Sequence, residues 1–341
     1  MTSVLQAPDL EKLLVKGLKI AIISHFNPDG DAIGSSVGML RFLQDSGMEA
    51  TAVTPSPIPG FLDFLDPDKE IVCYRDDTGR AKEAVLGADI IICLDFNRLE
   101  RTEWMAEVIA SSKAEKVLID HHPEPDTERF NLIISDPDAS STCELLYRTL
   151  LGFSSVNGNP SRLSLAALTA IATGLITDTN NFNNSLTPDT FIIASDMLRL
   201  GVDFDLINNM VFKRYTESRM RLMGHLLTES MSIDRRLSAS SMVLTIEDRE
   251  KFNFSDGDSD GFVNLPLMIH DVEVSALFSE TKDYVRVSLR SKGNVAVNAL
   301  SKAYFNGGGH PRAAGGRLFM PVNQVREYFL ESLEQFLQNN R

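Results

Sequence analysis

One histidine and two aspartates follow a short apolar run within seven residues of one another. The run, residues 19–23, is typical of a buried strand, and His25, Asp29 and Asp31 come after it. The Asn-Pro and Asp-Gly pairs between them favour a tight loop. Two carboxylates this close repel each other unless a cation lies between them. These three side chains are therefore candidate ligands of a metal ion.

Side chains of the same kind recur at the ends of three further apolar segments. Any one of them alone has an ordinary explanation, as a helix cap or a solvated loop residue. Together they are hard to explain by structure alone, because the carboxyl ends of parallel strands meet at one edge of a sheet, where sites form. We add these residues to the candidate metal site: Asp95, Asp120, His121, His122 and Asp178.

The candidate set holds carboxylates and imidazoles and no thiolates. Oxygen ligands favour Mg²⁺ or Mn²⁺, and imidazole shifts the preference toward Mn²⁺, Co²⁺ or Zn²⁺. Six or seven ligands are more than one ion needs, whereas two ions about 3.5–4 Å apart, bridged by one carboxylate, would use them. A pair of this kind binds a phosphate and activates water. We therefore expect two divalent ions, Mn²⁺ first, with Mg²⁺ or Co²⁺ as alternatives.

Strand-like and helical patterns alternate over the first 150 residues, which predicts an α/β fold. The alternation favours a mostly parallel sheet with helices on both faces. We expect this larger domain to span residues 1–190. The predicted strands are residues 19–24, 49–54, 71–74, 89–95, 116–120 and 132–135, and the predicted helices are 33–44, 80–86 and 100–111.

The rest of the chain predicts a helical connector, residues 191–230, and a smaller α/β domain, residues 231–341. We expect the active-site cleft between the two domains. In the smaller domain we expect a glycine-rich turn between the helix at residues 295–305 and the strand at residues 316–320. The expected strands are 237–246, 272–280, 283–291 and 316–320, and the expected helices are 295–305 and one that begins at Val322.

Composition limits the classes of protein that this chain can belong to. The 341 residues carry a formal net charge of −14, which does not favour binding along a nucleic acid such as duplex DNA. A small phosphorylated ligand is compatible with that charge. No apolar stretch approaches the roughly 20 residues of a membrane span, and we recognise no secretory signal. We expect a cytoplasmic protein that is not inserted in a membrane.

These motifs together resemble the DHH phosphoesterase superfamily. Asp120-His121-His122 is similar to its naming triplet, and residues 25–32 are similar to its first motif. Asp95 and Asp178 match its second and fourth motifs. Residues 307–316 resemble the glycine-rich motif of the associated DHHA1 domain. In length and order of motifs the chain is most similar to the nanoRNase and pAp-phosphatase type, which implies hydrolysis of short oligoribonucleotides to mononucleotides and dephosphorylation of pAp-like nucleotides.

The resemblance also implies a role for each matching residue. Asp95 would bridge two ions, and His122 would lie near the substrate phosphate. Asp120 would orient the side chain of His122. His25 and Asp29 would complete one ion site. The second site would be completed by Asp31, His121 and Asp178.

The second domain is implied to bind the far end of the nucleotide. The glycines at positions 307–309 would allow backbone N–H groups to approach an anion. The end of a helix followed by a turn is an alternative explanation for the same glycines. We expect Phe182 and Phe305 to lie in the core, with stacking on bases as the alternative. A homodimer is also implied by the family. The expected substrate-binding residues are Arg290, Ser291, Gly308, Gly309 and His310.

Two other functions remain open on the sequence. A phosphodiesterase specific for cyclic di-AMP or linear pApA would need the same metal ligands. A non-catalytic nucleotide sensor on the same fold would be expected to have lost some ligands, and none is missing here. Relative rates on pAp, pApA and cyclic di-AMP would separate the two enzymes.

Overall fold

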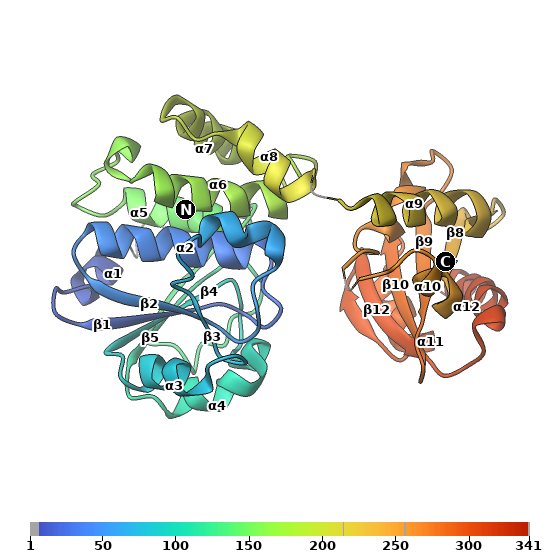
Figure 1. The fold of residues 1–341 in the computed structure, drawn as a ribbon, viewed down its shortest axis with the longest axis horizontal. Helices are drawn as coiled ribbons and strands as arrows, with labels where there is room; N and C mark the ends of the chain where they lie inside the picture. Colours follow the sequence, from blue (N-terminus) through green and yellow to red (C-terminus); the bar gives the residue numbers. More distant parts are fainter. Residues whose placement is uncertain (1–6, 214, 256, 340–341) are drawn as a thin grey trace. The chain divides into compact units, whose positions relative to one another are not determined.

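Six parallel strands form one sheet in the order β3-β2-β1-β4-β5-β6 (Figure 1). All six correspond to predicted strands. The strand order reverses between β1 and β4, and open α/β sheets bind ligands beyond the carboxyl ends of the strands at such a point. The bounds are β1 (Lys19–Ile23), β2 (Glu49–Thr54), β3 (Val72–Cys73), β4 (Ile90–Leu94), β5 (Glu115–Asp120) and β6 (Leu132–Ser135).

The computed structural model describes residues 7–213, 215–255 and 257–339. The chain forms two units, Met1–Arg214 and Tyr215–Arg341. Residues 191–230, the predicted connector, are divided between them. Ile193 and Ile207 pack in the core of the first unit, whereas Leu222 packs in a core of the second.

Neighbouring residues of the central strands point into two different cores. Ile22 and Ile92 face one core, and Ile23 and Cys93 face the other. Helices therefore cover both faces of the sheet, as predicted (Figure 1). One face is covered by α1 (Ala7–Leu13), α2 (Gly30–Asp45), α5 (Thr142–Leu151), α6 (Leu165–Asp178), α7 (Pro188–Arg199) and α8 (Phe204–Phe212), and the other by α3 (Thr78–Leu86), η3 (Leu99–Met105) and α4 (Ala106–Ser111).

Helices α2 and α6 pack closely because glycine lies at their contact. A Cβ atom on Gly34 would lie 2.5 Å from the carbonyl oxygen of Ala170 and 2.8 Å from the amide nitrogen of Gly174. Any larger side chain at position 34 would push the two helices apart. This contact holds the first turn of α2, which carries Asp31, against α6, which ends at Asp178.

The predicted helix at residues 100–111 is wrong in its first half. The structure has the 3₁₀ segment η3 there, followed by α4. Glu103 has a positive φ of 50°, which interrupts the helix. The carbonyl of Arg101 accepts a hydrogen bond from the Phe26 amide at 2.8 Å. That carbonyl therefore ties η3 to the loop that carries His25.

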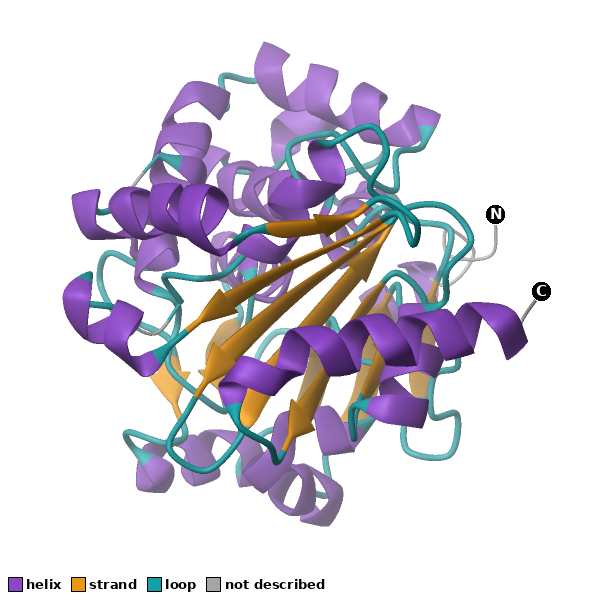
Figure 2. Ribbon diagram, turned by 90° about the vertical axis from the view of Figure 1, so that its right-hand side faces the viewer, coloured by secondary structure: helices purple, strands orange, loops and turns teal. Residues whose placement is uncertain are grey.

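Six strands also form the sheet of the second unit, in the order β11-β12-β10-β9-β8-β7. All pairs are antiparallel except β8 with β9. Figure 2 shows the last helix crossing in front of strands and ending at the C-terminal label. The strands are β7 (Ser232–Asp234), β8 (Ala239–Leu244), β9 (Val274–Glu280), β10 (Val285–Ser291), β11 (Gly308–His310) and β12 (Ala313–Leu318).

Helices cover both faces of this second sheet as well. Phe329 and Leu300 pack on one face together with Phe278, and Leu222 packs on the other with Met242. The smaller α/β domain is thus confirmed. The α-helices of this unit are α9 (Glu217–His225), α10 (Ile246–Lys251), α11 (Val297–Tyr304) and α12 (Val325–Asn339), and it also has the π-helical segment η5 (Leu226–Ser230) and the 3₁₀ segments η6 (Phe262–Met268) and η7 (Val322–Gln324).

The glycine-rich segment differs from its prediction. Where a turn was expected, Gly308–His310 forms the edge strand β11, paired with β12. Strand β12 begins at Ala313, three residues earlier than predicted. Glycine carries no periodic pattern of apolar side chains, so a strand built on it leaves little trace in the sequence.

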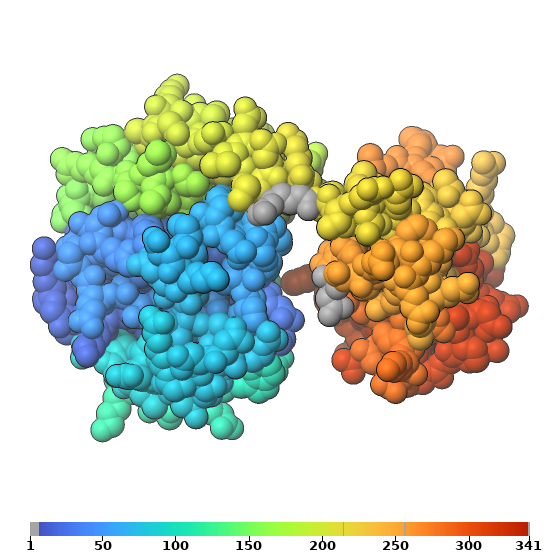
Figure 3. Space-filling model, viewed as in Figure 1, coloured from blue at the N-terminus to red at the C-terminus, as the bar shows by residue number. Residues whose placement is uncertain are grey.

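Helices α7 and α8 lie at the surface of the first unit (yellow-green in Figure 3). Several of their apolar side chains are exposed, including Phe191, Ile192 and Leu198. Among the described residues, no helix is both long enough and apolar enough to cross a membrane.

Candidate metal centre and substrate-binding residues

The expected metal ligands of the first unit lie together at the carboxyl edge of its sheet. Asp95 belongs to two of the groups that the structure brings together, which is the position that a bridging carboxylate needs. His121 also belongs to two. In each group the ligand atoms lie within 4.8 Å of one another, and the groups are His25-Asp29-Asp95, Asp31-His121-Asp178 and Asp95-His121-His122. Which residue would hold which ion stays a prediction.

Backbone carbonyls orient two imidazoles of the cluster, those of His25 and His121. His25 Nδ1 lies 2.9 Å from the carbonyl of Phe26, and His121 Nδ1 lies 3.2 Å from that of Ala139. An Nδ1–H that donates to a carbonyl leaves Nε2 without a proton and free to bind a metal. His25 Nε2 faces Asp95 Oδ2 at 3.5 Å, and His121 Nε2 faces Asp178 Oδ2 at 3.6 Å. Both rings therefore present the nitrogen that a metal site requires.

The start of helix α5 holds the Asp31 carboxylate in place. The amides of Thr142 and Cys143 donate to its two oxygens at 2.6 and 2.9 Å. The Thr142 hydroxyl also donates to Asp95 Oδ1 at 2.9 Å. Thr142 is thus a positioning residue that the sequence analysis missed, and only its place before a helical pattern marks it in the sequence.

Asp29 has a structural role besides its expected one. It is the N-cap of α2, and its Oδ1 accepts from the amides of Asp31 and Ala32 at 3.0 and 3.1 Å. This cap fixes where α2 begins. It therefore sets the position of Asp31 relative to the loop of His25.

Asp95 adopts an uncommon backbone conformation, with φ of 67°. Positive φ is uncommon outside glycine, and asparagine and aspartate adopt it more readily than most other residues. Its side chain is 3% exposed. The turn after β4 therefore places a buried carboxylate at the centre of the cluster.

The charges of the cluster shift the pKa values of its members. Burial, followed by the charges of Asp95 and Asp178, raises the pKa of Asp31 well above its ordinary range. Burial also raises the pKa of Asp178, to about 7, against the opposing effect of His121. For Asp95 burial acts upward, but the hydrogen bond and charge of His25 outweigh it, and the pKa falls.

These shifts test whether a metal fits the site. Four carboxylates this close together, of which Asp31 and Asp95 are buried, cannot all ionise without added positive charge. Divalent cations supply that charge, and the donor set of carboxylate oxygens and imidazole nitrogens suits Mn²⁺. The cluster therefore fits a metal centre.

His122 forms a separate pair with Asp120. Its Nδ1 lies 2.7 Å from Asp120 Oδ1. Asp120 is fully buried, and its Oδ2 has no hydrogen-bond partner among the described residues. Burial lowers the pKa of His122, but the bond and charge of Asp120 outweigh burial and raise it, against the charge of Arg101. Asp120 thus orients the ring and favours its protonated form.

The expected substrate-binding residues of the second unit share one end of its sheet. Register pairs His310 with Ala313 and Ala313 with Arg290, so the three residues lie in one row across β11, β12 and β10. Paired residues of adjacent strands point to the same face, which puts the imidazole and the guanidinium on one side. The amide of Ser291 donates to the carbonyl of Arg312, and its hydroxyl donates to that of Val295.

The two expected substrate-binding glycines, Gly308 and Gly309, differ in whether the fold requires glycine. Gly309 has φ of 135°, and a Cβ there would lie 2.6 Å from the carbonyl oxygen of Ala313. At Gly308 a Cβ would meet no atom within 4 Å. The two neighbouring glycines therefore differ, because only Gly309 is demanded by the fold.

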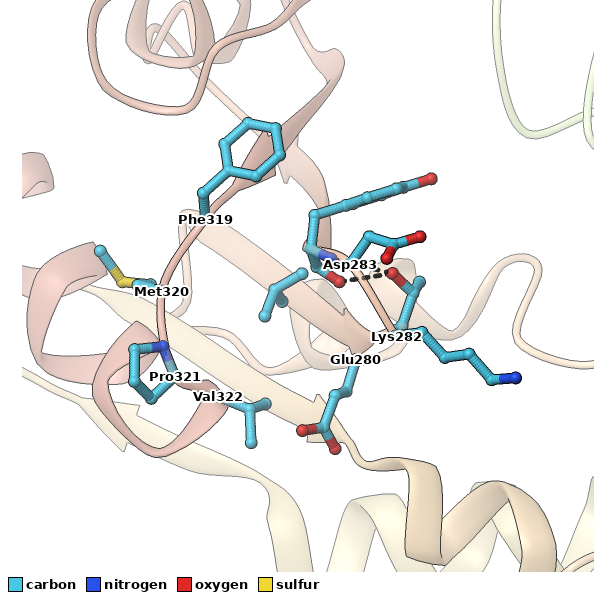
Figure 4. Close-up of a pocket in the computed structure, with 10 residues that line it drawn as sticks. Glu280, Lys282, Asp283, Phe319, Met320, Pro321 and Val322 are labelled. Carbon is cyan, nitrogen blue, oxygen red and sulfur yellow. Dashed lines mark hydrogen bonds between the residues drawn. The ribbon is translucent and has the colours of Figure 1, made fainter.

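Figure 4 shows a pocket of about 380 Å³ in the second unit, with Phe319 and Pro321 on one side and Glu280 and Lys282 on another. It contains none of the expected substrate-binding residues. One of its lining residues is Val285, the first residue of β10. Val285 lies six residues from Ser291, which is about 20 Å along the strand. This pocket is thus at the opposite end of the sheet.

The two aromatic candidates for base stacking have different outcomes. Phe305 is fully buried in the core of the second unit, as expected, which excludes the alternative that it stacks on a base. Phe182 is partly buried and stacks on Phe191 at a centroid distance of 5.8 Å. Its ring packs against the apolar core of the first unit.

Comparison with known proteins identifies the motifs. Residues 19–175 match the DHH family, N-terminal domain, and residues 239–339 match the DHHA1 domain. The chain is 30% identical to the bifunctional oligoribonuclease and PAP phosphatase NrnA of Thermus thermophilus, over 322 residues that cover 93% of this chain and 90% of that protein. It is 25% identical to the cyclic-di-AMP phosphodiesterase GdpP of Geobacillus thermodenitrificans, covering 97% of this chain but 50% of that protein.

A solved structure is also similar over the whole chain. It is the crystal structure of an exopolyphosphatase-related protein from Bacteroides fragilis, with 36% identity and a TM-score of 0.92. The match covers 97% of this chain and 96% of that one.

Proposed function

Because the chain belongs to the DHH/DHHA1 phosphoesterase superfamily, we propose that it hydrolyses short oligoribonucleotides to mononucleotides and dephosphorylates pAp-like nucleotides. The observation that carries the proposal is the convergence of carboxylates and imidazoles around Asp95. The relative with the bifunctional name matches nearly full length, whereas the cyclic-di-AMP phosphodiesterase is matched over half of its length. The coverage supports the first function over the second.

Two divalent ions would be held by the predicted ligands, with Asp95 between them. When bound, such ions supply the positive charge that activates water and stabilises the charge of a phosphate under attack. Mn²⁺ is the ion that we propose, since the site combines carboxylates with imidazoles. The remaining ligands are His25, Asp29, Asp31, His121 and Asp178.

His122 and Asp120 would act on the substrate phosphate. Because Asp120 holds Nδ1 of His122, the other ring nitrogen can donate a hydrogen bond to a phosphate oxygen when the ring is protonated. Asp120 holds the ring orientation through Nδ1. We propose that this pair positions the phosphate.

In the second domain, Arg290 and His310 would bind the distal phosphate of the nucleotide, together with the backbone of Gly308 and Gly309 and with Ser291. The common row of Arg290 and His310 supports this assignment, because both can approach one anion. The cleft between domains, the homodimer and the cytoplasmic location expected from the sequence stay predictions.

A substrate panel tests the proposed function. The purified chain is incubated with Mn²⁺ and with pAp, pApA, a five-nucleotide RNA, a twenty-four-nucleotide RNA, cyclic di-AMP, pyrophosphate and polyphosphate, and every product is followed by chromatography. We expect rapid loss of pAp and of the shortest RNAs. The Asp95→Asn variant, purified in the same way, controls for contaminating nucleases.

Other outcomes would contradict the proposal. Preference for cyclic di-AMP over pAp and short RNA would favour the phosphodiesterase alternative. Nucleotide binding without turnover in Mn²⁺, Mg²⁺ or Co²⁺ would favour the sensor. Turnover of polyphosphate alone would exclude both nucleotide hydrolases.

A further inference from the structure

A second cavity lies beside the metal centre, within the first unit. Its volume is about 440 Å³, inside the range of about 300–1,000 Å³ that small-ligand sites occupy. His25 lines it, and this residue also belongs to the ligand cluster. The cavity is thus contiguous with the proposed reaction centre.

Two hydrogen bonds to backbone carbonyls hold the loops of this cavity together. The Phe26 amide donates to the carbonyl of Arg101 at 2.8 Å. The Asn97 side-chain amide donates to the carbonyl of Pro123 at 2.7 Å, next to His122. The loops after β1, β4 and β5 are therefore tied to one another at the same sheet edge, and the cavity is a built feature.

The side chains of the cavity suit a nucleoside. Phe26 provides an aromatic ring, and Trp104 supports it edge to face at a centroid distance of 5.1 Å. The guanidinium groups of Arg98 and Arg101 can stack on bases as well as bind oxygen. Asn27 offers an amide that can bond to the edge of a base.

The charge of the cavity argues against a bare phosphate chain. Two glutamates, Glu100 and Glu103, line it together with the two arginines, so the formal charges cancel. Arg98 also lies 3.9 Å from the Glu124 carboxylate. Carboxylates repel phosphate but accept hydrogen bonds from ribose hydroxyls. A neutral base and its ribose match this lining better than a polyanion.

We infer that this cavity, between the loops of Phe26 and Arg101, binds the base and ribose of the nucleotide next to the phosphate under attack. The inference rests on the proposed function and deepens it, because it adds a nucleoside subsite within the first unit. Phe26 would stack on the base, and Arg101 would cover its other side or bond to its edge. The site would then discriminate nucleotides from polyphosphate.

Steady-state kinetics on short RNA tests the subsite. Arg101→Gln removes the guanidinium but keeps the carbonyl that fixes Phe26, and Phe26→Leu removes the aromatic ring. Each should raise KM for a trinucleotide at least about fivefold, the lower end of what one stacked base contributes, with little change in kcat. Arg75→Gln, a similarly exposed arginine outside the cavity, should leave KM unchanged.

A trinucleotide series lacking the base at one position makes the test specific. Removal of one particular base should weaken binding to the wild type but have little further effect in Phe26→Leu. Equal losses in both proteins at every position would overturn the subsite, even when the wild type hydrolyses RNA. No hydrolysis of any nucleotide by the wild type would instead contradict the proposed function.

Fluorescence gives a reading that does not depend on catalysis. Trp104 is the one tryptophan of the 341-residue chain and contacts Phe26. With a chelator present to prevent turnover, a trinucleotide should change the emission of the wild type, and inorganic tripolyphosphate should not. The same response to both ligands, or to neither, would contradict a nucleoside site. Leu198 on α7 is exposed to a similar extent as Trp104, and the Leu198→Ala variant should behave as the wild type.

Discussion

The Thr142 hydroxyl donates a 2.9 Å hydrogen bond to Asp95 Oδ1, and the amide of the same residue donates to Asp31 at 2.6 Å. Two proposed metal ligands, which come from different elements of the sheet domain, are thus held by one residue at the start of α5. The bonds occupy one lone pair on each carboxylate oxygen concerned and leave others for a metal.

Replacement of Thr142 by valine tests this relationship. Thr142→Val keeps the amide bond to Asp31 and the side-chain volume, but removes the bond to Asp95. We expect metal affinity or turnover to fall by about 10–100-fold, as for other residues that orient metal ligands. Thr149→Val is the matched control, since its buried hydroxyl on the same helix donates to the carbonyl of Leu145. Mn²⁺ activation curves for both variants give the measurement, and equal curves would contradict the positioning role.

The close packing of α2 and α6 provides a second prediction. In Gly34→Ala the new methyl group would clash with backbone atoms of α6, which cannot move as a side chain can. The helices should separate, so that Asp31 and Asp178 no longer reach the same ion. We expect a lower unfolding temperature and weaker Mn²⁺ binding, measured by calorimetry. Gly224→Ala in α9 meets no atom within 4 Å and should keep both properties.

The parallel sheet and most of the metal cluster could be predicted from the sequence. Buried parallel strands are continuous apolar runs, and their carboxyl ends lie at one edge, so residues such as His25, Asp95 and His121 had to be neighbours. Asp178 is different, because it ends a helix. Its place beside Asp31 depends on how closely α2 and α6 pack, and no local pattern records that distance.

The glycines of strand β11 should respond differently to alanine. Gly309→Ala forces a side chain into positive φ and against a backbone carbonyl, which should cost about 1–3 kcal/mol in the free energy of unfolding. In Gly308→Ala the new methyl group would meet no atom within 4 Å, so this variant should unfold near the wild-type temperature. Thermal denaturation followed by circular dichroism distinguishes them. Equal unfolding temperatures would show that the backbone of β11 adapts.

The side chain of Asp248, in the second unit, should make the free energy of unfolding depend on pH. Burial raises the pKa of Asp248, but hydrogen bonds from Thr245 and His225 outweigh it, so its pKa lies below the ordinary value. A lowered folded pKa stabilises the fold above the unfolded value of about 3.9, and this stabilisation disappears as pH falls through the folded pKa. The effect is therefore present at pH 5 and reduced at pH 3.

Asp248→Asn measures this contribution. The variant should be less stable than the wild type at pH 5 by about 1 kcal/mol, the usual contribution of a hydrogen bond, because the loss of charge weakens the bonds that Asp248 accepts from Thr245, the N-cap of α10. At pH 3 the difference in the free energy of unfolding should be smaller. Urea denaturation at both pH values provides the comparison, and an identical difference at pH 5 and pH 3 would show that the charge of Asp248 contributes nothing.

The parts that sequence analysis missed depend on tertiary contacts. The helix expected at residues 100–111 breaks at Glu103, where the preceding turn is tied to the loop of Phe26. Phe305 could not be separated from a base-stacking aromatic until its burial was known. Thr142 looks like an ordinary residue of a helix start, and its bond to Asp95 spans 47 residues of sequence. Each of these features is set by a segment distant in the chain.

Asp95→Asn is the variant that separates the bridging charge of this carboxylate from the fold around it. Asparagine tolerates the positive φ of this position and has nearly the same shape, so the fold and its unfolding temperature should be preserved while the bridging charge is lost. We predict that calorimetric titration with Mn²⁺ shows two ions in the wild type and weaker or incomplete binding in the variant. Turnover of pAp and short RNA should then be undetectable. Binding of two ions and near-normal turnover by Asp95→Asn would contradict a metal centre built around this carboxylate.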